Sequence, residues 1–105
     1  MPVLNSSGKG FVGVLAAELY FPDNGSLKGK RMYLRRIRDQ VTRRHGASFA
    51  EVGHQDLWQR SRVVIAIASS DIQVLEESLD RVKAYLDSQE WMLSWCSIEV
   101  VDVDA

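Results

Sequence analysis

The sequence has few of the residues that build disulfides, metal sites or membrane segments. Cys96 is the one cysteine among 105 residues, so the chain cannot form an internal disulfide, and no Cys/His spacing is typical of a zinc site. The longest aliphatic run, residues 63–68, has six residues, whereas a membrane-spanning helix needs about 20. The N-terminus lacks the basic segment and apolar core of a secretory signal. We therefore expect a protein of the reducing cytoplasm with no membrane segment.

What is present is the composition of a folded domain. Hydrophobic residues make up 46% of the chain and charged residues 26%, as is typical of soluble globular proteins. The length suits one domain. Residues 1–10 combine Pro, Asn, Ser and Gly with little to bury, which predicts a flexible tail followed by a single domain over residues 11–105.

The net charge of −1 hides a strong division along the chain. Residues 1–62 carry 11 Lys/Arg and 5 Asp/Glu, whereas residues 63–105 carry 2 and 9. Between Ser26 and Gly46, eight basic residues stand with a single acid, Asp39. This asymmetry makes nucleic acid a candidate partner but does not by itself establish it.

Apolar periodicity and turn residues predict six elements in the order βαββαβ. A strand over 11–20 ends at the turn cluster of residues 22–25. The first helix, residues 27–45, has Ser26 placed as its N-cap and Gly46 as its C-terminal stop. Asp71 is placed to cap the second helix. Its apolar residues recur at steps of three and four: Ile72, Leu75, Leu79, Val82 and Leu86. The other strands are expected at 47–52, 62–69 and 93–103, with a long loop over 53–60.

The residue pattern predicts that two of these strands are central in the sheet and two lie at its edges. Residues 14–17 and 63–67 are apolar at consecutive positions, so both faces of those strands should be covered. The strands holding Glu51, Glu99 and Asp102 suit the edges. Right-handed crossovers then give a ferredoxin-like α+β fold, an antiparallel sheet of order 4-1-3-2 with two helices on one face. Because the second face is also apolar, we expect a homodimer packed sheet to sheet, with a small-molecule pocket as the alternative.

Two segments have residue patterns that the fold alone does not require: SLKGKR at 26–31 and AEVGHQDLWQR at 50–60. With VGV at 12–14 and EL at 18–19, they closely resemble the YlxP-like family of small bacterial proteins of unknown function, over residues 11–103. The resemblance implies a ferredoxin-like fold, a bacterial cytoplasm and no established enzymatic activity. Genes of that family commonly lie beside those for translation initiation factor two and ribosome-binding factor A, so the resemblance also implies a role near the ribosome or RNA. The family often has Glu where this chain has Gly29, which leaves a capping box incomplete.

The first helix is the main candidate binding surface. Its outward cations would contact phosphates of RNA or of a ribosomal surface. The alternative is a solvated face whose charge is neutralised by the acidic second helix, within the chain or across a dimer. Lys30 lies near the apolar arc, and we expect its side chain to extend past the core to solvent. The predicted binding residues of this helix are Lys28, Arg31, Arg35, Arg38 and Arg43.

The loop over 53–60 completes the predicted site. Trp58 is a candidate for stacking or for anchoring a partner, and Arg60 for clamping a phosphate or carboxylate. For His54 and Asp56 we favour structural roles, a hydrogen bond to the backbone and a turn cap, over a catalytic pair or a metal site. For Glu18, an ion pair with an Arg or Lys of the first helix or the loop, or solvation at the strand end, is favoured over catalysis.

The remaining aromatic residues favour packing over chemistry. Residues 63–67 contain no aromatic side chain, so RNA bases are not expected to stack on the sheet face. Trp91, Trp95 and Cys96 are interpreted as packing residues. The sequence thus predicts a non-enzymatic protein without cofactor or metal, which binds RNA, the ribosome or a translation factor. A dimeric regulatory module that binds a small molecule at the sheet face or dimer seam is the alternative.

Overall fold

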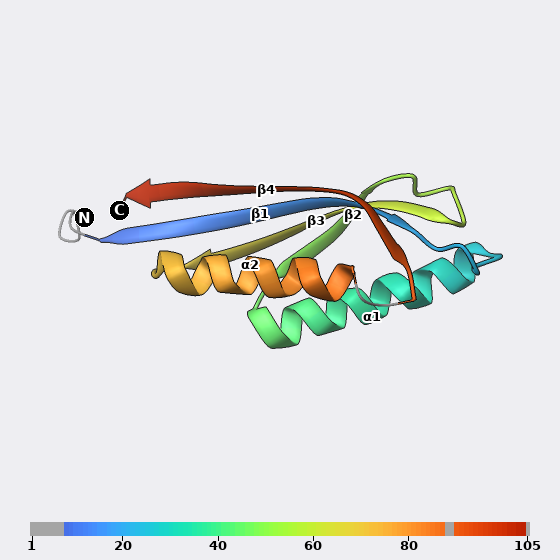
Figure 1. Ribbon diagram of the computed structural model, residues 1–105, viewed down its shortest axis with the longest axis horizontal. Helices are drawn as coiled ribbons and strands as arrows, with labels where there is room; N and C mark the ends of the chain where they lie inside the picture. Colours follow the sequence, from blue (N-terminus) through green and yellow to red (C-terminus); the bar gives the residue numbers. More distant parts are fainter. Residues whose placement is uncertain (1–7, 88–89, 105) are drawn as a thin grey trace.

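The computed structural model describes residues 8–87 and 90–104. Six elements follow one another in the predicted order (Figure 1). They are β1 (Lys9–Tyr20), α1 (Leu27–His45), β2 (Ser48–Gly53), β3 (Arg60–Ser69), α2 (Ile72–Leu86) and β4 (Met92–Asp104). Of the predicted tail, residues 1–7 lie outside the described residues, whereas Lys9 and Gly10 belong to β1 and pair with β4.

The four strands form one antiparallel sheet of order β2-β3-β1-β4. Both helices cover the same face of this sheet (Figure 1). This confirms the predicted ferredoxin-like α+β fold and its strand order. The turn between β1 and α1 and the loop between β2 and β3 lie together at one end of the sheet, opposite the end where β1 begins and β4 finishes (Figure 1).

The caps predicted from the sequence are formed. Ser26 Oγ accepts a hydrogen bond from Gly29 N at 2.9 Å, and α1 ends at Gly46 in the left-handed conformation with φ of 61°. Asp71 Oδ1 accepts from Gln73 N and Val74 N at the start of α2. Local chemistry therefore sets both ends of α1 and the start of α2.

The core lies between the sheet and the helices. Alternate residues of the two central strands point to the helices, as the period of two requires, and α1 and α2 supply the opposing apolar stripes. A Cβ at Gly13 would lie 2.6 Å from Leu79 Cδ1, so this glycine lets α2 approach β1 closely. The fully buried core side chains include Leu15, Leu19, Ile37, Val41, Val63, Ile65, Leu75, Leu79, Val82 and Leu86.

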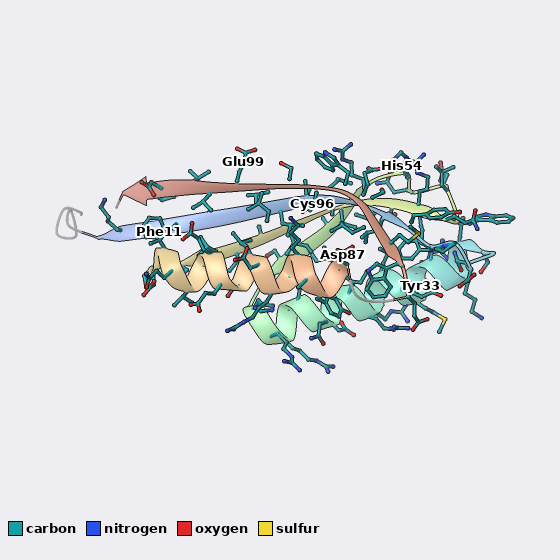
Figure 2. The ribbon with its side chains drawn as sticks, viewed as in Figure 1. Phe11, Tyr33, His54, Asp87, Cys96 and Glu99 are labelled. Carbon is teal, nitrogen blue, oxygen red and sulfur yellow. The ribbon has the colours of Figure 1, made fainter. Side chains whose placement is uncertain are left out.

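The other face of the sheet is open, and Figure 2 shows Glu99 and His54 on this side and Tyr33 on the helix side. Its centre is apolar, because Val12, Val14 and Ala16 of β1 lie across from Ala68, Ala66 and Val64 of β3. These β1 residues are partly exposed. The prediction of a bare apolar face is therefore confirmed.

Candidate functional site

Four of the predicted cations form a single row along α1. Lys28, Arg31, Arg35 and Arg38 follow one another at steps of three, four and three residues, which places them on one face of an α-helix. All four side chains are exposed. We call this row the cationic stripe.

The cationic stripe borders an open groove between α1 and β2. Arg31, Arg35 and Arg38 line this groove of about 340 Å³ together with Phe49, whose ring is partly buried. Glu51 also lines it, but its carboxylate is held by Lys30 and by the hydroxyl of Ser61. The groove thus presents three guanidinium groups beside Phe49, a partly buried residue that packs against the hydrophobic core. Sequence reasoning missed Phe49, although its place on an edge strand beside a basic helix could have indicated it.

The other cations of α1 have different places. At about 100° per residue, Arg43 lies about 140° around the helix from Arg38 but only about 60° from Lys28, so it stands beside the cationic stripe and outside its row. Arg36 is half exposed but contacts other groups of the protein, with an ion pair to Glu90 at 3.0 Å and its guanidinium 5.7 Å from the ring centroids of both Tyr33 and Trp91. Arg36 therefore supports the aromatic cluster rather than a partner surface.

Within the described part of one chain, the acidic second helix does not pair with the first. Within residues 8–87 and 90–104, no ion pair joins α1 to α2. Arg38 Nε lies 3.9 Å from Asp39 Oδ1, but both side chains are about half exposed, and such pairs contribute little. The stripe consequently faces solvent with its charge largely uncompensated.

The expectation for Lys30 was wrong. Its side chain is only 2% exposed, and the ammonium stays inside the protein, 3.0 Å from Glu51 Oε2. The Nζ also donates to the main-chain oxygens of His54, Gln55 and Arg60. These acceptors belong to the β2–β3 loop and the first residue of β3, so a buried cation fixes the path of the whole loop.

A second polar cluster lies on the open face at the same end of the sheet. His54 Nε2 is 2.9 Å from Glu18 Oε1, and Arg60 Nη2 and Arg62 Nε lie 3.5 and 3.6 Å from the same carboxylate. The Arg62 guanidinium also stacks over the ring of Trp95, 4.4 Å from its centroid. Glu18 is thus an ion-paired structural carboxylate, as favoured from the sequence. Its partners come from the loop and β3, none of them from the first helix.

His54 and Asp56 do not form a pair in the described residues. The imidazole of His54 binds Glu18 rather than the backbone, and His54 itself takes a left-handed conformation with φ of 59°. Its main-chain oxygen accepts from Leu57 N at 3.0 Å, which closes the turn around the exposed Asp56. Within residues 8–87 and 90–104, no group of three or more His, Cys, Asp or Glu side chains is placed to hold a metal ion.

The predicted loop residues lie apart from the stripe. The Trp58 side chain is 55% exposed, while its main-chain oxygen accepts from Asn24 Nδ2 at 2.6 Å. The same amide donates to the main-chain oxygen of Ser26, so Asn24 ties the loop to the start of α1. Arg60 lies on the open face beside Glu18. The seven predicted site residues therefore lie in four places. Lys28, Arg31, Arg35 and Arg38 form the stripe, and Arg43 lies beside it on α1. Trp58 is in the loop, and Arg60 is on the open face.

Of the two tryptophans near β4, Trp91 packs in the core as predicted, whereas Trp95 is 42% exposed. Trp91 is 2% exposed and lies edge-on to Phe21, Tyr33 and Tyr85. Burial raises the pKa of the Cys96 thiol, against a smaller opposite effect of Lys83, so this thiol is not activated as a nucleophile. Among the helices described, none is both long and apolar enough to cross a membrane.

The βαββαβ order, with two helices on one face of an antiparallel sheet, defines a ferredoxin-like α+β protein. Residues 12–103 match the family described as "Protein of unknown function (DUF503)", and the chain belongs to that family. The chain is 42% identical over 77 residues to the uncharacterized protein YlxP of Bacillus subtilis (strain 168), covering 73% of this chain and 84% of that protein. This confirms the resemblance found in the sequence motifs.

Similarity to a solved structure supports the assignment of the fold and nothing more. The structural-genomics protein YJCS superposes with a TM-score of 0.51 at 9% identity, over 84% of this chain and 96% of its own. The de novo designed protein Foldit4 superposes with a TM-score of 0.46 at 16% identity, over 90% of this chain and 98% of its own.

Proposed function

We propose that this protein is a non-enzymatic RNA-binding protein of the bacterial cytoplasm, which contacts the phosphate backbone through the cationic stripe. The observation that carries the proposal is the stripe itself. Four exposed cations stand in one row, and no carboxylate of α2 pairs with them in the described part of the chain. Solubility alone does not require such a row.

The dimensions of the stripe suit a nucleic-acid backbone. At about 1.5 Å per residue, Lys28 and Arg38 lie about 15 Å apart along the helix axis. Phosphates held along this length release counterions, which supplies sequence-independent affinity. The Phe49 ring lines the same groove, and single-strand binders commonly combine a cationic groove with an aromatic ring that stacks on a base.

The family resemblance indicates which RNA to test first. Genes of the YlxP-like family commonly neighbour those for translation factors and ribosome maturation, so ribosomal RNA is the first candidate. A protein surface of the ribosome or of a translation factor is the competing partner. Naked ribosomal RNA fragments distinguish the two, because they hold phosphates but no protein surface.

The test compares two charge reversals of equal size. Arg35→Glu with Arg38→Glu lies in the stripe, whereas Lys9→Glu with Lys83→Glu changes exposed residues of β1 and α2. We expect the stripe variant to lose co-sedimentation with ribosomes and binding to ribosomal RNA, and the control to retain both. Unchanged co-sedimentation of the stripe variant would reject the proposal.

A second proposal concerns the open face, where we infer that a second copy of the chain packs. Exposed apolar surface of this extent is uncommon on monomers, and Trp95 and Val101 of β4 are 42% and 49% exposed. Arg62 pairs with Glu18 and Glu99 pairs with Val14, so the two charged residues lie on either side of Ala16 along β1. A two-fold axis across the strands at Ala16 would bring the cationic end of each copy over the acidic part of the other.

The competing role is a small-molecule site at this face or at the dimer seam, which the Glu18 cluster favours because it brings a carboxylate, two guanidinium groups and an indole together. A metabolite that raises the melting temperature independently of salt would support this role instead.

A further inference from the structure

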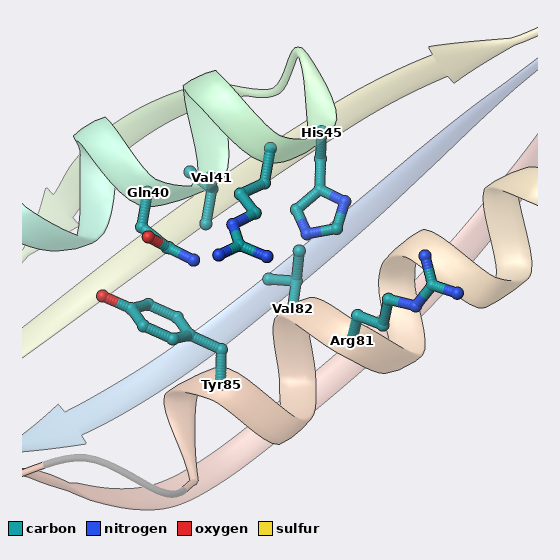
Figure 3. A pocket seen from close by; sticks show the side chains of 7 residues that line it. Gln40, Val41, His45, Arg81, Val82 and Tyr85 are labelled. Carbon is teal, nitrogen blue, oxygen red and sulfur yellow. The ribbon is translucent and has the colours of Figure 1, made fainter.

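The sequence motifs leave one concave feature of the helix layer unexplained. Between α1 and α2 lies a cleft of about 420 Å³, lined by Gln40, Val41, Arg44, His45, Arg81, Val82 and Tyr85. Figure 3 shows Gln40 and His45 of α1 and Val82 and Tyr85 of α2 extending into the space between the two helices. We call it the interhelix cleft. Its volume falls within the range of roughly 300–1,000 Å³ typical of small-molecule sites.

The polar lining of the interhelix cleft is cationic or hydrogen-donating. Arg44 and Arg81 contribute guanidinium groups from the two helices, and none of the described residues that line the cleft carries a carboxylate. In the described part of the chain, neither guanidinium takes part in an ion pair. Gln40, His45 and Tyr85 add an amide, an imidazole and a phenol, all able to donate hydrogen bonds.

Stabilisation of helix ends does not account for this arrangement. Cations in the last turn of α1, such as Arg44 and His45, offset the negative end of the helix dipole. Arg81 is different, because it lies within α2, five residues before its end at Leu86. The nearby carbonyls of α1 are also satisfied, since Thr42 O accepts from Gly46 N and Val41 O from Ala47 N. Within the described residues, no carboxylate therefore pairs with the two guanidinium groups of the cleft.

We propose that the interhelix cleft binds a small phosphate-bearing anion, with Arg44 and Arg81 as the cationic groups that attract it. Arginine suits this ligand because its planar fork matches phosphate oxygens with two parallel hydrogen bonds. The site is separate from the cationic stripe, which borders β2 on another flank of α1, so the inference does not depend on the RNA proposal.

The ionisation of His45 supports the inference and supplies a readout. Burial, Arg81 and Arg44, in this order, lower the pKa of His45 below its ordinary value. The charged groups that face it are thus Arg44 from its own helix and Arg81 from α2. A bound dianion would offset both guanidinium groups, so it should raise the pKa of His45 and favour its protonated form.

The experiment follows the two histidines by NMR while inorganic phosphate is added at constant ionic strength. The chain has two histidines, and His54 is an internal reference because it binds Glu18 on the opposite side of the sheet. We expect the His45 imidazole signals to shift saturably and its titration midpoint to rise, with His54 unchanged. Equal shifts at both histidines, or a shift that does not saturate, would overturn the proposal.

Variants locate the binding. Arg44→Gln with Arg81→Gln should abolish the His45 response, whereas Lys9→Gln with Lys83→Gln should leave it intact. All four side chains are exposed, so both variants should keep the wild-type melting temperature. A response that survives in the arginine variant would contradict the assignment. A parallel titration with adenosine monophosphate identifies the source of the phosphate, because tighter binding than that of the free ion indicates an organic phosphate.

Discussion

At the scale of single residues, the buried ammonium of Lys30 holds the β2–β3 loop to α1. It binds one carboxylate and three main-chain oxygens, and its side chain is 2% exposed. A charge in such a place is tolerated only because every donor has an acceptor. The loop that presents Trp58 therefore has a defined path rather than a mobile one.

Replacement of Lys30 by Met keeps the length of the side chain and removes its charge. We expect Lys30→Met to lower the free energy of unfolding by about 3 kcal/mol, because Glu51 and the three carbonyls lose their donor. Chemical denaturation measures this change, and Lys28→Met, exposed on the same helix, should stay within about 0.5 kcal/mol of wild type. Equal stability of Lys30→Met and Lys28→Met would disprove the role given to Lys30.

The role of Lys30 could not be predicted from the sequence. Its position at the edge of the apolar arc was readable, but its main-chain acceptors lie 24 to 30 residues further along the chain. The same holds for Glu18, whose need for a partner was evident while its pairing with His54 depends on the sheet register. Contacts of this kind arise from tertiary structure and leave no local pattern.

At the scale of elements, the fold was predictable because local signals agreed with one another. Ser26, Gly46 and Asp71 mark helix ends by their own hydrogen bonds, and the apolar runs of β1 and β3 identify the central strands. The cationic stripe was also readable from spacing within α1. What spacing could not show is that Arg36 turns to the aromatic cluster and that Phe49 of β2 lies beside the stripe.

The first turn of α1 depends on a close approach between two residues. A Cβ at Gly29 would collide with Asn24 Oδ1, and Asn24 donates to the main-chain oxygens of Ser26 and Trp58. Ala normally stabilises a helix by about 0.5–1 kcal/mol relative to Gly. Here we expect Gly29→Ala to be destabilising, by about 1 kcal/mol or more, because Asn24 must give up its hydrogen bonds.

A double-mutant cycle isolates this effect. In the background of Asn24→Ala the obstacle is gone, so Gly29→Ala should become neutral or stabilising. Thermal or urea unfolding of the four proteins gives the coupling energy. If Gly29→Ala costs the same in both backgrounds, the collision with Asn24 is not the reason for glycine at this position.

At the scale of the whole molecule, the two faces of the sheet have different proposed roles. The helix layer carries the cationic stripe, while the open face carries the apolar strip of β1 and β3. A dimer through the open face would leave both stripes exposed and outward. Two stripes on one particle would raise the affinity for a long RNA through multivalency.

The proposed dimer is tested by a substitution at its axis. Ala16→Lys would bring two ammonium groups together on the two-fold axis, so we expect a monomer by light scattering at a concentration where the wild-type protein is a dimer. Ala84→Lys, on the exposed side of α2, is the matched control and should remain dimeric. A wild-type protein that is monomeric at all concentrations would exclude the dimer.

The central claim is that the cationic stripe binds RNA phosphates, and the salt dependence of the affinity tests it most directly. Four phosphate contacts at about −0.7 each predict a slope of log affinity against log salt of about −2.8 for single-stranded RNA. Arg35→Gln with Arg38→Gln should reduce this slope to about −1.4, while Arg43→Gln, outside the stripe, should leave it unchanged. A double variant that keeps the wild-type slope, or an Arg43→Gln variant that lowers it as much, would contradict the account.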